Sequence, residues 1–247
     1  DQDAFAELSG DFNPLHVDAI VARRLLFGTQ VVHGIHALLW ALDCNFKDHG
    51  GKVALSSVKS TFLKPIRVGD SVSLFIEEEA ESEVIMQLRY GATTMSRVKL
   101  RWQNGEQEEG KVDLAMKASQ QKSPREWSED EIAHAAGEIG LYLKIEEVTK
   151  SFPNLVRCLP LAQIATIMGT TRLVGMECPG LHSIYSELDL LASNEHKEQS
   201  LRYEVTNFNK GFGLVAMTVE GLGMAGQIKA FIRPRPQEQE TCANLKD

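Results

Sequence analysis

The sequence predicts an α+β protein with two units of similar organisation, each with one long apolar helix followed by strands. Two apolar runs of helical length, residues 34–44 and 161–175, are each followed by strand-like segments. A polar stretch separates these two sets of elements at residues 104–125. The chain has 247 residues, too many for one small domain and suitable for two packed units of about 110 to 130 residues.

The first unit is expected to begin with two short helices, at residues 3–8 and 18–26, ahead of the apolar helix 34–44. Its strands are predicted where β-branched and apolar residues alternate with polar ones, between turns that carry Pro65, Gly69 and Gly91. These strands are expected at residues 52–63, 71–80, 83–90 and 93–103.

The second unit is expected to begin at a capping box, Ser128-Glu-Asp-Glu131, that opens a helix toward Gly140. After its apolar helix, strands are predicted at residues 183–191, 200–208, 213–220 and 227–233. We therefore divide the chain into a first unit at 1–104, a linker at 105–127, a second unit at 128–234 and a polar tail or linker at 235–247.

Residues 9–16 read Ser-Gly-Asp-Phe-Asn-Pro-Leu-His and carry the densest chemical information in the chain. Gly10 allows a reversal and Pro14 biases Asn13 toward an extended conformation, so we expect a tight loop rather than a helix. In such a loop the Asp11 carboxylate and the His16 imidazole can face one pocket as an acid–base pair. The alternative is an ordinary turn, in which these side chains only satisfy backbone N–H groups.

Residues 5–18, which contain this block, resemble the signature of the MaoC-like, (R)-specific enoyl-CoA hydratase family. Residues 30–34, Gln-Val-Val-His-Gly, resemble its second motif, and residues 57–70 resemble the strand and turn that follow its central helix. The resemblance implies a hot-dog fold, here in a double form. It also implies Asp11 and His16 as the catalytic pair, Asn13 as their support, and the Gly34 N–H as donor to the thioester carbonyl.

The activity that this resemblance implies is reversible hydration of trans-2-enoyl thioesters to (R)-3-hydroxyacyl thioesters, a lyase reaction of fatty acid metabolism. We expect Pro14, Val32 and His33 to contact the substrate, with His33 mainly ordering the turn before Gly34. His36 and His182 are expected to be structural. The acyl carrier is CoA or acyl carrier protein, and acyl chain length, branching and physiological direction are not encoded in these motifs.

The second unit contains no Asp-x-Asn-Pro-x-His block and no His-Gly pair, so we expect it to lack the chemistry. Two other functions stay open. A different hot-dog enzyme, such as an acyl-thioesterase, is compatible with the fold, because a fold alone does not fix a function. A non-catalytic acyl-binding module of a multidomain protein is compatible with one motif-bearing unit beside one without.

The amino-acid composition limits which partners and which cellular compartment we expect for this protein. A formal net charge of −8 argues against a nucleic-acid surface. Four widely spaced cysteines favour reduced thiols in a cytoplasmic protein, and no apolar run approaches the roughly 20 residues of a membrane span. No nucleotide-binding motif and no metal-ligand spacing occurs, so neither a cofactor nor a metal is expected. Candidates for a basic rim around the carrier's phosphates are Arg23, Arg24, Lys59, Lys64 and Arg67.

The two ends of the sequence fit either a chain without the usual lead-in strand or a piece of a longer polypeptide. The chain begins at Asp1, inside the lead-in to the motif, and ends on the polar run 233–240, which resembles a linker to further domains. A frayed terminus is the equal alternative for that run. Two fused units correspond to the dimer of single-unit family members, so both a monomer and a homodimer of double units fit the sequence.

Overall fold

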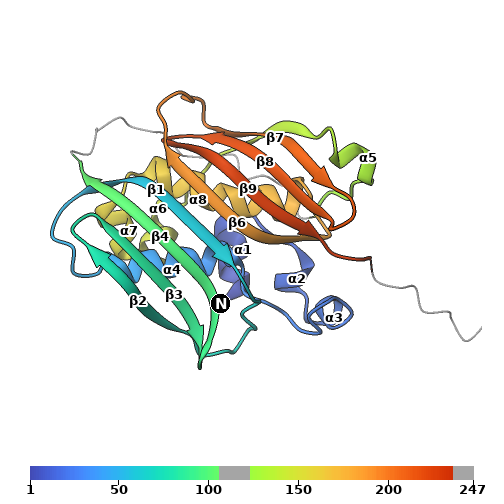
Figure 1. Ribbon diagram of the computed structural model, residues 1–247, viewed down its shortest axis with the longest axis horizontal. Helices are drawn as coiled ribbons and strands as arrows, with labels where there is room; N and C mark the ends of the chain where they lie inside the picture. The colour runs from blue at the N-terminus through green and yellow to red at the C-terminus, as the bar shows by residue number, and fades with distance from the viewer. Residues whose placement is uncertain (106–122, 236–247) are drawn as a thin grey trace, which may run out of the picture.

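The computed structural model describes residues 1–105 and 123–235 (Figure 1). In the first half, three short helices precede a long one: α1 (Gln2–Ser9), α2 (Pro14–Val17), α3 (Ala19–Arg23) and α4 (Gly34–Asn45). Four strands follow: β1 (Val53–Phe62), β2 (Ser73–Ala80), β3 (Glu83–Tyr90) and β4 (Thr93–Asn104). Helix α4 is apolar on nearly every side, which suits a helix buried against a sheet.

The second half repeats this plan with added helices. It contains α5 (Glu129–Ile132), β5 (Ala136–Gly140), α6 (Ile145–Ser151), α7 (Pro153–Cys158) and α8 (Leu161–Arg172). A π-helical turn, η1 (Leu173–Glu177), extends α8, and the strands β6 (Ser183–Ala192), β7 (Ser200–Asn209), β8 (Leu214–Gly221) and β9 (Met224–Ile232) complete the half. Helix α8 is buried along most of its length, as α4 is.

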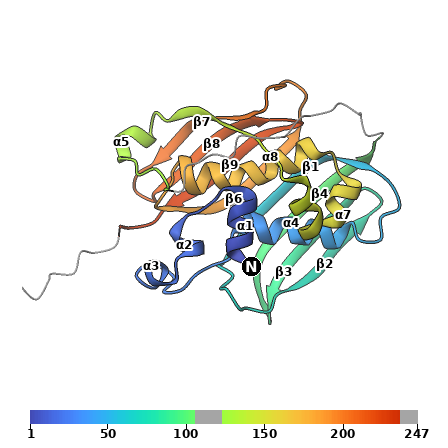
Figure 2. The same cartoon turned by 180° about the vertical axis from the view of Figure 1, so that it is seen from behind.

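The strands of both halves form one antiparallel sheet of nine strands in the order β2-β3-β4-β1-β6-β9-β8-β7-β5. Strands β1 and β6 join the halves, with Ser57 opposite Leu191 at one end of their pairing and Thr61 opposite Glu187 at the other. Helices α1, α4 and α8 lie on one face of the sheet, α4 over the first half and α8 over the second (Figure 2). The main core lies between this face and the helices, and it continues from one half into the other.

Most of the predicted elements are confirmed, and two predictions are wrong. The capping box at Ser128 is present, but its helix ends at Ile132, because residues 136–140 pair with β7 as an edge strand. The tight loop ends at Asn13, because the Asn13 side chain accepts a hydrogen bond from the Leu15 N–H and Pro14 takes the first helical position of α2. Helices α6 and α7 were not foreseen.

Several predictions lie wholly or partly outside the described residues. The predicted linker and tail fall mostly there, and so does Cys242, so the domain boundaries stay a prediction. The other three cysteines, Cys44, Cys158 and Cys178, are free thiols. Within the described ranges, no helix combines the length and the apolar character needed to cross a membrane.

Candidate active site

The Asp11 carboxylate is buried where the two halves of the chain meet. Gly10 ends α1 with φ of 78°, in the left-handed region, and turns the chain so that Asp11 faces inward. One carboxylate oxygen, Oδ1, accepts a hydrogen bond from the Asn13 N–H at 3.2 Å. The other, Oδ2, accepts one from the Thr171 hydroxyl at 2.7 Å. A carboxylate that is only 1 % exposed is thus held from both sides.

His16 lies on α2, one helical turn beyond the loop that carries Asp11. Its Nδ1 is 2.8 Å from the Val31 carbonyl oxygen, which can only accept, so Nδ1 carries a proton and Nε2 is the nitrogen free to exchange one. One ligand atom each of Asp11, His16 and His33 lies within 4.8 Å of the other two. A single water molecule can bridge groups at this separation, which makes the pair suitable for acid–base chemistry on water.

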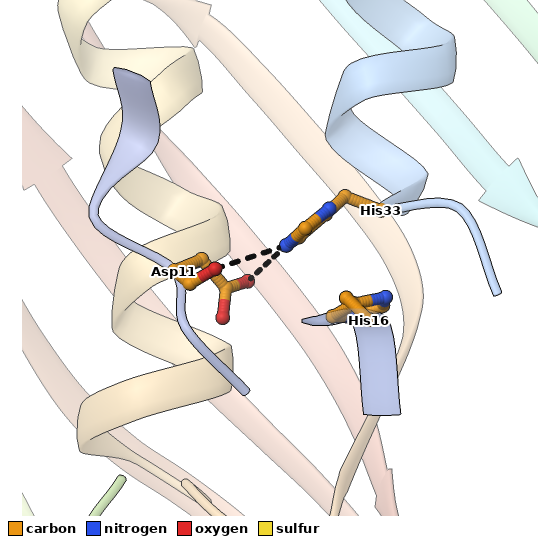
Figure 3. A group of neighbouring side chains, drawn as sticks. All are labelled: Asp11, His16 and His33. Carbon is orange, nitrogen blue, oxygen red and sulfur yellow. Dashed lines mark hydrogen bonds and ion pairs between the residues drawn. The ribbon is translucent and has the colours of Figure 1, made fainter. Parts of the chain in front are cut away.

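His33 occupies the N-cap of α4 and is fully buried beside this pair (Figure 3). Its ring stacks on the His16 ring with centroids 3.8 Å apart. Its Nε2 lies 3.1 Å from the Asp11 carbonyl oxygen and 3.8 Å from Asp11 Oδ2. On the other side, Nδ1 donates to Gln2 Oε1 at 2.8 Å, since the same oxygen also accepts the His33 backbone N–H. His33 therefore links the motif loop to the start of α4.

Burial shifts the proton affinities of all three groups. Desolvation raises the pKa of Asp11, while His16, the Thr171 hydroxyl, the Asn13 N–H and Arg172 oppose that rise. Desolvation also lowers the pKa of His16, an effect that the Asp11 charge partly reverses. The pKa of His33 is well below its ordinary value, because of its burial and the neighbouring His16. These opposed shifts bring a carboxyl and an imidazole closer in proton affinity, which favours proton exchange between them.

The π-helical turn η1 of the second half holds the motif loop of the first. Asn13 Nδ2 donates to the Gly175 carbonyl oxygen at 3.0 Å, and the Phe12 N–H lies 3.2 Å from the Met176 sulfur. The widened turn is closed by the Cys178 N–H, which donates to the Leu173 carbonyl oxygen at 2.7 Å. Such turns occur frequently at functional sites. No local signal in the sequence predicts these contacts, because residues 171–177 continue an apolar helical run.

A cavity of about 240 Å³ opens beside Asp11 and His16. Both halves line it, and its walls are mainly apolar, with Val32, Ala37 and Phe62 from the first half and Val174 and Tyr185 from the second. Gly34, the first residue of α4, also lines it. A Cβ at Gly34 would lie 3.0 Å from two Phe62 ring carbons, so any other residue here would require the ring to shift by a few tenths of an ångström.

The predicted site residues divide into two groups. Asp11, His16, Val32 and Gly34 line the cavity, whereas Asn13, Pro14 and His33 lie behind it and shape it; substrate contact stays a prediction for each. Among the candidates for a basic rim, Lys64 lines the cavity. Lys59 instead pairs with Asp189 at 2.6 Å across the β1–β6 junction.

His36 and His182 were predicted to be structural, and both lie outside the cavity lining. His36 stacks on Phe5 and lies 3.2 Å from Gln2 Nε2. His182 lies 3.3 Å from Glu126.

Asp11, His16 and His33 also form a group that could hold a metal ion. Spacing in the sequence did not indicate it, because the three residues come from a loop and two helices. His33 Nε2 and both Nδ1 atoms already contact protein oxygens, so an ion would compete with the contacts that orient the rings. The expectation from the sequence that no metal binds here stays a prediction.

Residues 1–99 match the family model described as MaoC like domain. This part of the chain is a MaoC-like domain. Two of its curated relatives are 36 % and 38 % identical to this chain over the residues that match. The 36 % match, to the 3-hydroxybutyryl-CoA dehydratase of Methylorubrum extorquens, spans 75 residues, 30 % of this chain and 47 % of that protein. The 38 % match, to the (R)-specific enoyl-CoA hydratase of Aeromonas caviae, spans 82 residues, 32 % of this chain and 60 % of that protein.

A solved structure resembles the chain beyond its MaoC-like domain. The structure is titled MaoC-like dehydratase, and the similarity covers 94 % of this chain and 93 % of that one, with a TM-score of 0.57 and 12 % identity. At this identity the similarity speaks for the fold alone. The predicted hot-dog fold is confirmed over both halves, including the half that lacks the motif.

Proposed function

We propose that the protein catalyses the reversible hydration of trans-2-enoyl thioesters to (R)-3-hydroxyacyl thioesters, with CoA or acyl carrier protein as the carrier. The observation that carries the proposal is the approach of Asp11 and His16 to within 4.8 Å at one wall of a mainly apolar cavity. The two relatives named as a dehydratase and a hydratase support it, and so does the family model, whose match over residues 1–99 includes both residues of this pair.

Hydration adds the oxygen of water to C3 of the enoyl group and a proton to C2. In our mechanism the Asp11 carboxylate removes one proton from a water molecule held between Asp11 and His16. The resulting hydroxide oxygen bonds to C3, and the C2=C3 electron pair shifts to make an enolate. The proton taken up by Asp11 passes to His16 Nε2, which delivers it to C2. Water has then supplied both the oxygen on C3 and the proton on C2, and both residues are back in their starting protonation states.

The enolate oxygen needs a hydrogen-bond donor while it carries negative charge. The first N–H groups of a helix have no acceptor within the helix, and the helix dipole adds positive potential there. Gly34 begins α4 at the cavity wall, so we assign its N–H to the thioester carbonyl. One preorganised donor of this kind contributes about 3 to 4 kcal/mol to transition-state stabilisation.

The first test follows the ultraviolet absorbance of crotonyl-CoA, whose conjugated band disappears when water adds across the double bond. The protein should remove the band, and Asp11→Asn should slow the reaction by about a thousandfold while the fold is kept. Near-normal turnover in Asp11→Asn would contradict the assignment. Free thiol release instead of hydration would identify a thioesterase, and acyl binding without turnover would identify a binding module.

We also propose a cellular compartment for this activity. Three free thiols among the described residues suit a reducing compartment, and we propose the cytoplasm.

A further inference from the structure

Thr171 differs from the other two threonines of α8 in what its hydroxyl contacts. Thr166 donates to the Leu222 carbonyl oxygen at 2.8 Å, and Thr170 donates to the Ile167 carbonyl oxygen at 2.7 Å. Thr171 instead donates to a carboxylate, Asp11 Oδ2, at 2.7 Å and across 160 positions of sequence. This hydroxyl comes from the half of the chain that lacks the catalytic motif.

The contact leaves Asp11 with one donor on each carboxylate oxygen. Oδ1 receives the Asn13 N–H, and Oδ2 receives the hydroxyl of Thr171, a residue that is 3 % exposed. Hydrogen bonds to an ionised group are stronger than those between neutral groups, and they fix its orientation. The carboxylate plane is therefore set by one residue from each half.

The same contact acts on the charge of Asp11. Burial favours the protonated carboxyl, which could not remove a proton from water. A hydroxyl that donates to Oδ2 stabilises the ionised carboxylate instead, and it is one of the groups that hold down the pKa of Asp11. Arg172, which follows Thr171, supports the ionised form by its charge.

We propose that Thr171 is a positioning residue for Asp11, which it keeps oriented toward the cavity and ionised in the hydration reaction. This inference rests on the proposed function for its catalytic meaning and on the Thr171–Asp11 contact for its physical basis. The second half then completes the catalytic group, although its sequence carries no part of the motif.

The test compares three variants by the pH dependence of kcat/KM on crotonyl-CoA. Thr171→Val removes the donor and keeps the shape of the side chain. The acid limb of the kcat/KM pH profile, where Asp11 becomes protonated, should move to a pH about one unit higher in this variant. At pH values below the midpoint of that limb, kcat/KM should then be about tenfold lower than in the parent. Thr171→Ser keeps the hydroxyl donor, so the acid limb of its pH profile should have the same midpoint as that of the parent. Thr166→Val removes a hydroxyl from the same buried helix without touching Asp11, and the acid limb of its pH profile should match the parent's.

A second readout is independent of turnover. The ¹³C resonance of the Asp11 carboxyl, assigned by its absence in Asp11→Asn, should titrate at higher pH in Thr171→Val than in the parent. If Thr171→Val does not fold, Thr171→Cys takes its place, because a thiol is only a weak donor.

Equal titration midpoints in the parent and the donor-free variant would overturn the inference, and so would a shifted limb in Thr171→Ser. A parent protein without hydratase activity would overturn the proposed function. In that case the carboxyl titration still decides the role of Thr171.

Discussion

Gly175 and Asp11 lie in direct contact, with no room between the π-helical turn and the carboxylate. A Cβ built on Gly175 would lie 2.6 Å from both Cγ and Oδ2 of Asp11. Because Gly175 and Asp11 are both buried, neither can move aside without disturbing the loop that follows Gly10. The absence of a side chain at one position of the second half thus determines where the first half keeps its carboxylate.

Gly175→Ala should therefore reduce kcat/KM on crotonyl-CoA by about a hundredfold, the cost expected when a catalytic group is displaced by about 1 Å. Gly50→Ala is a matched control, since a Cβ there would meet nothing within 4 Å. Activity of Gly175→Ala within threefold of the parent would mean that the carboxylate position is not critical.

The buried, ionised Asp11 carboxylate should lower the free energy of unfolding at neutral pH. Its folded-state pKa is raised, so the folded protein binds this proton more tightly than the unfolded chain does. The stability linked to that proton is fully present below the unfolded pKa of about 3.9 and is lost as the pH rises through the folded pKa. Asp11→Asn removes the charge, so its melting temperature relative to the parent should be higher at pH 8 than at pH 4. A constant difference would contradict the raised pKa.

His33 should support the catalytic pair without exchanging protons with the substrate. His33→Phe keeps a ring against His16 but loses the hydrogen bond from Nδ1 to Gln2 Oε1, together with the contact of Nε2 with the Asp11 carbonyl oxygen. The loss of one hydrogen bond between neutral groups should lower kcat/KM by about tenfold or less. A loss as large as that of Asp11→Asn would instead show that His33 takes part in the proton transfer. Steady-state kinetics on the three proteins separates these outcomes.

The cavity wall should control acyl chain length. Ala37 lies on α4 and lines the cavity, so Ala37→Leu adds three carbon atoms to a space of about 240 Å³. Turnover of a ten-carbon enoyl-CoA should fall about tenfold more than turnover of crotonyl-CoA, because the longer chain must displace the added side chain. Equal effects on both substrates would place the acyl chain elsewhere.

The sequence predicts those parts of the site whose signal is local. Asp11, Asn13 and His16 lie within six residues, and turn chemistry together with the motif makes them recognisable. The capping box at Ser128 likewise predicts a helix start, but nothing local marks its end at Ile132, since the pairing of β5 with β7 decides that.

Contacts between distant segments could not be predicted in this way. Thr171 and Gly175 read as ordinary members of an apolar helix, because their roles depend on a loop about 160 residues earlier in the chain. The sequence predicts that His33 mainly orders the turn before α4, whereas its stacking on His16 depends on how α2 approaches α4. The hydrophobic periodicity of the sequence does not show which distant segments come into contact.

The pairing of β1 with β6 makes the two halves dependent on each other for solubility as well as for chemistry. Each of these strands is ten residues long, and each would become an unprotected sheet edge if the halves were expressed separately. The β6 strand of the second half thus covers an edge of the first half's strands, and its π-helical turn holds the motif loop. Inherited substitutions at these positions should behave as loss-of-function alleles although they lie far from the motif in the sequence.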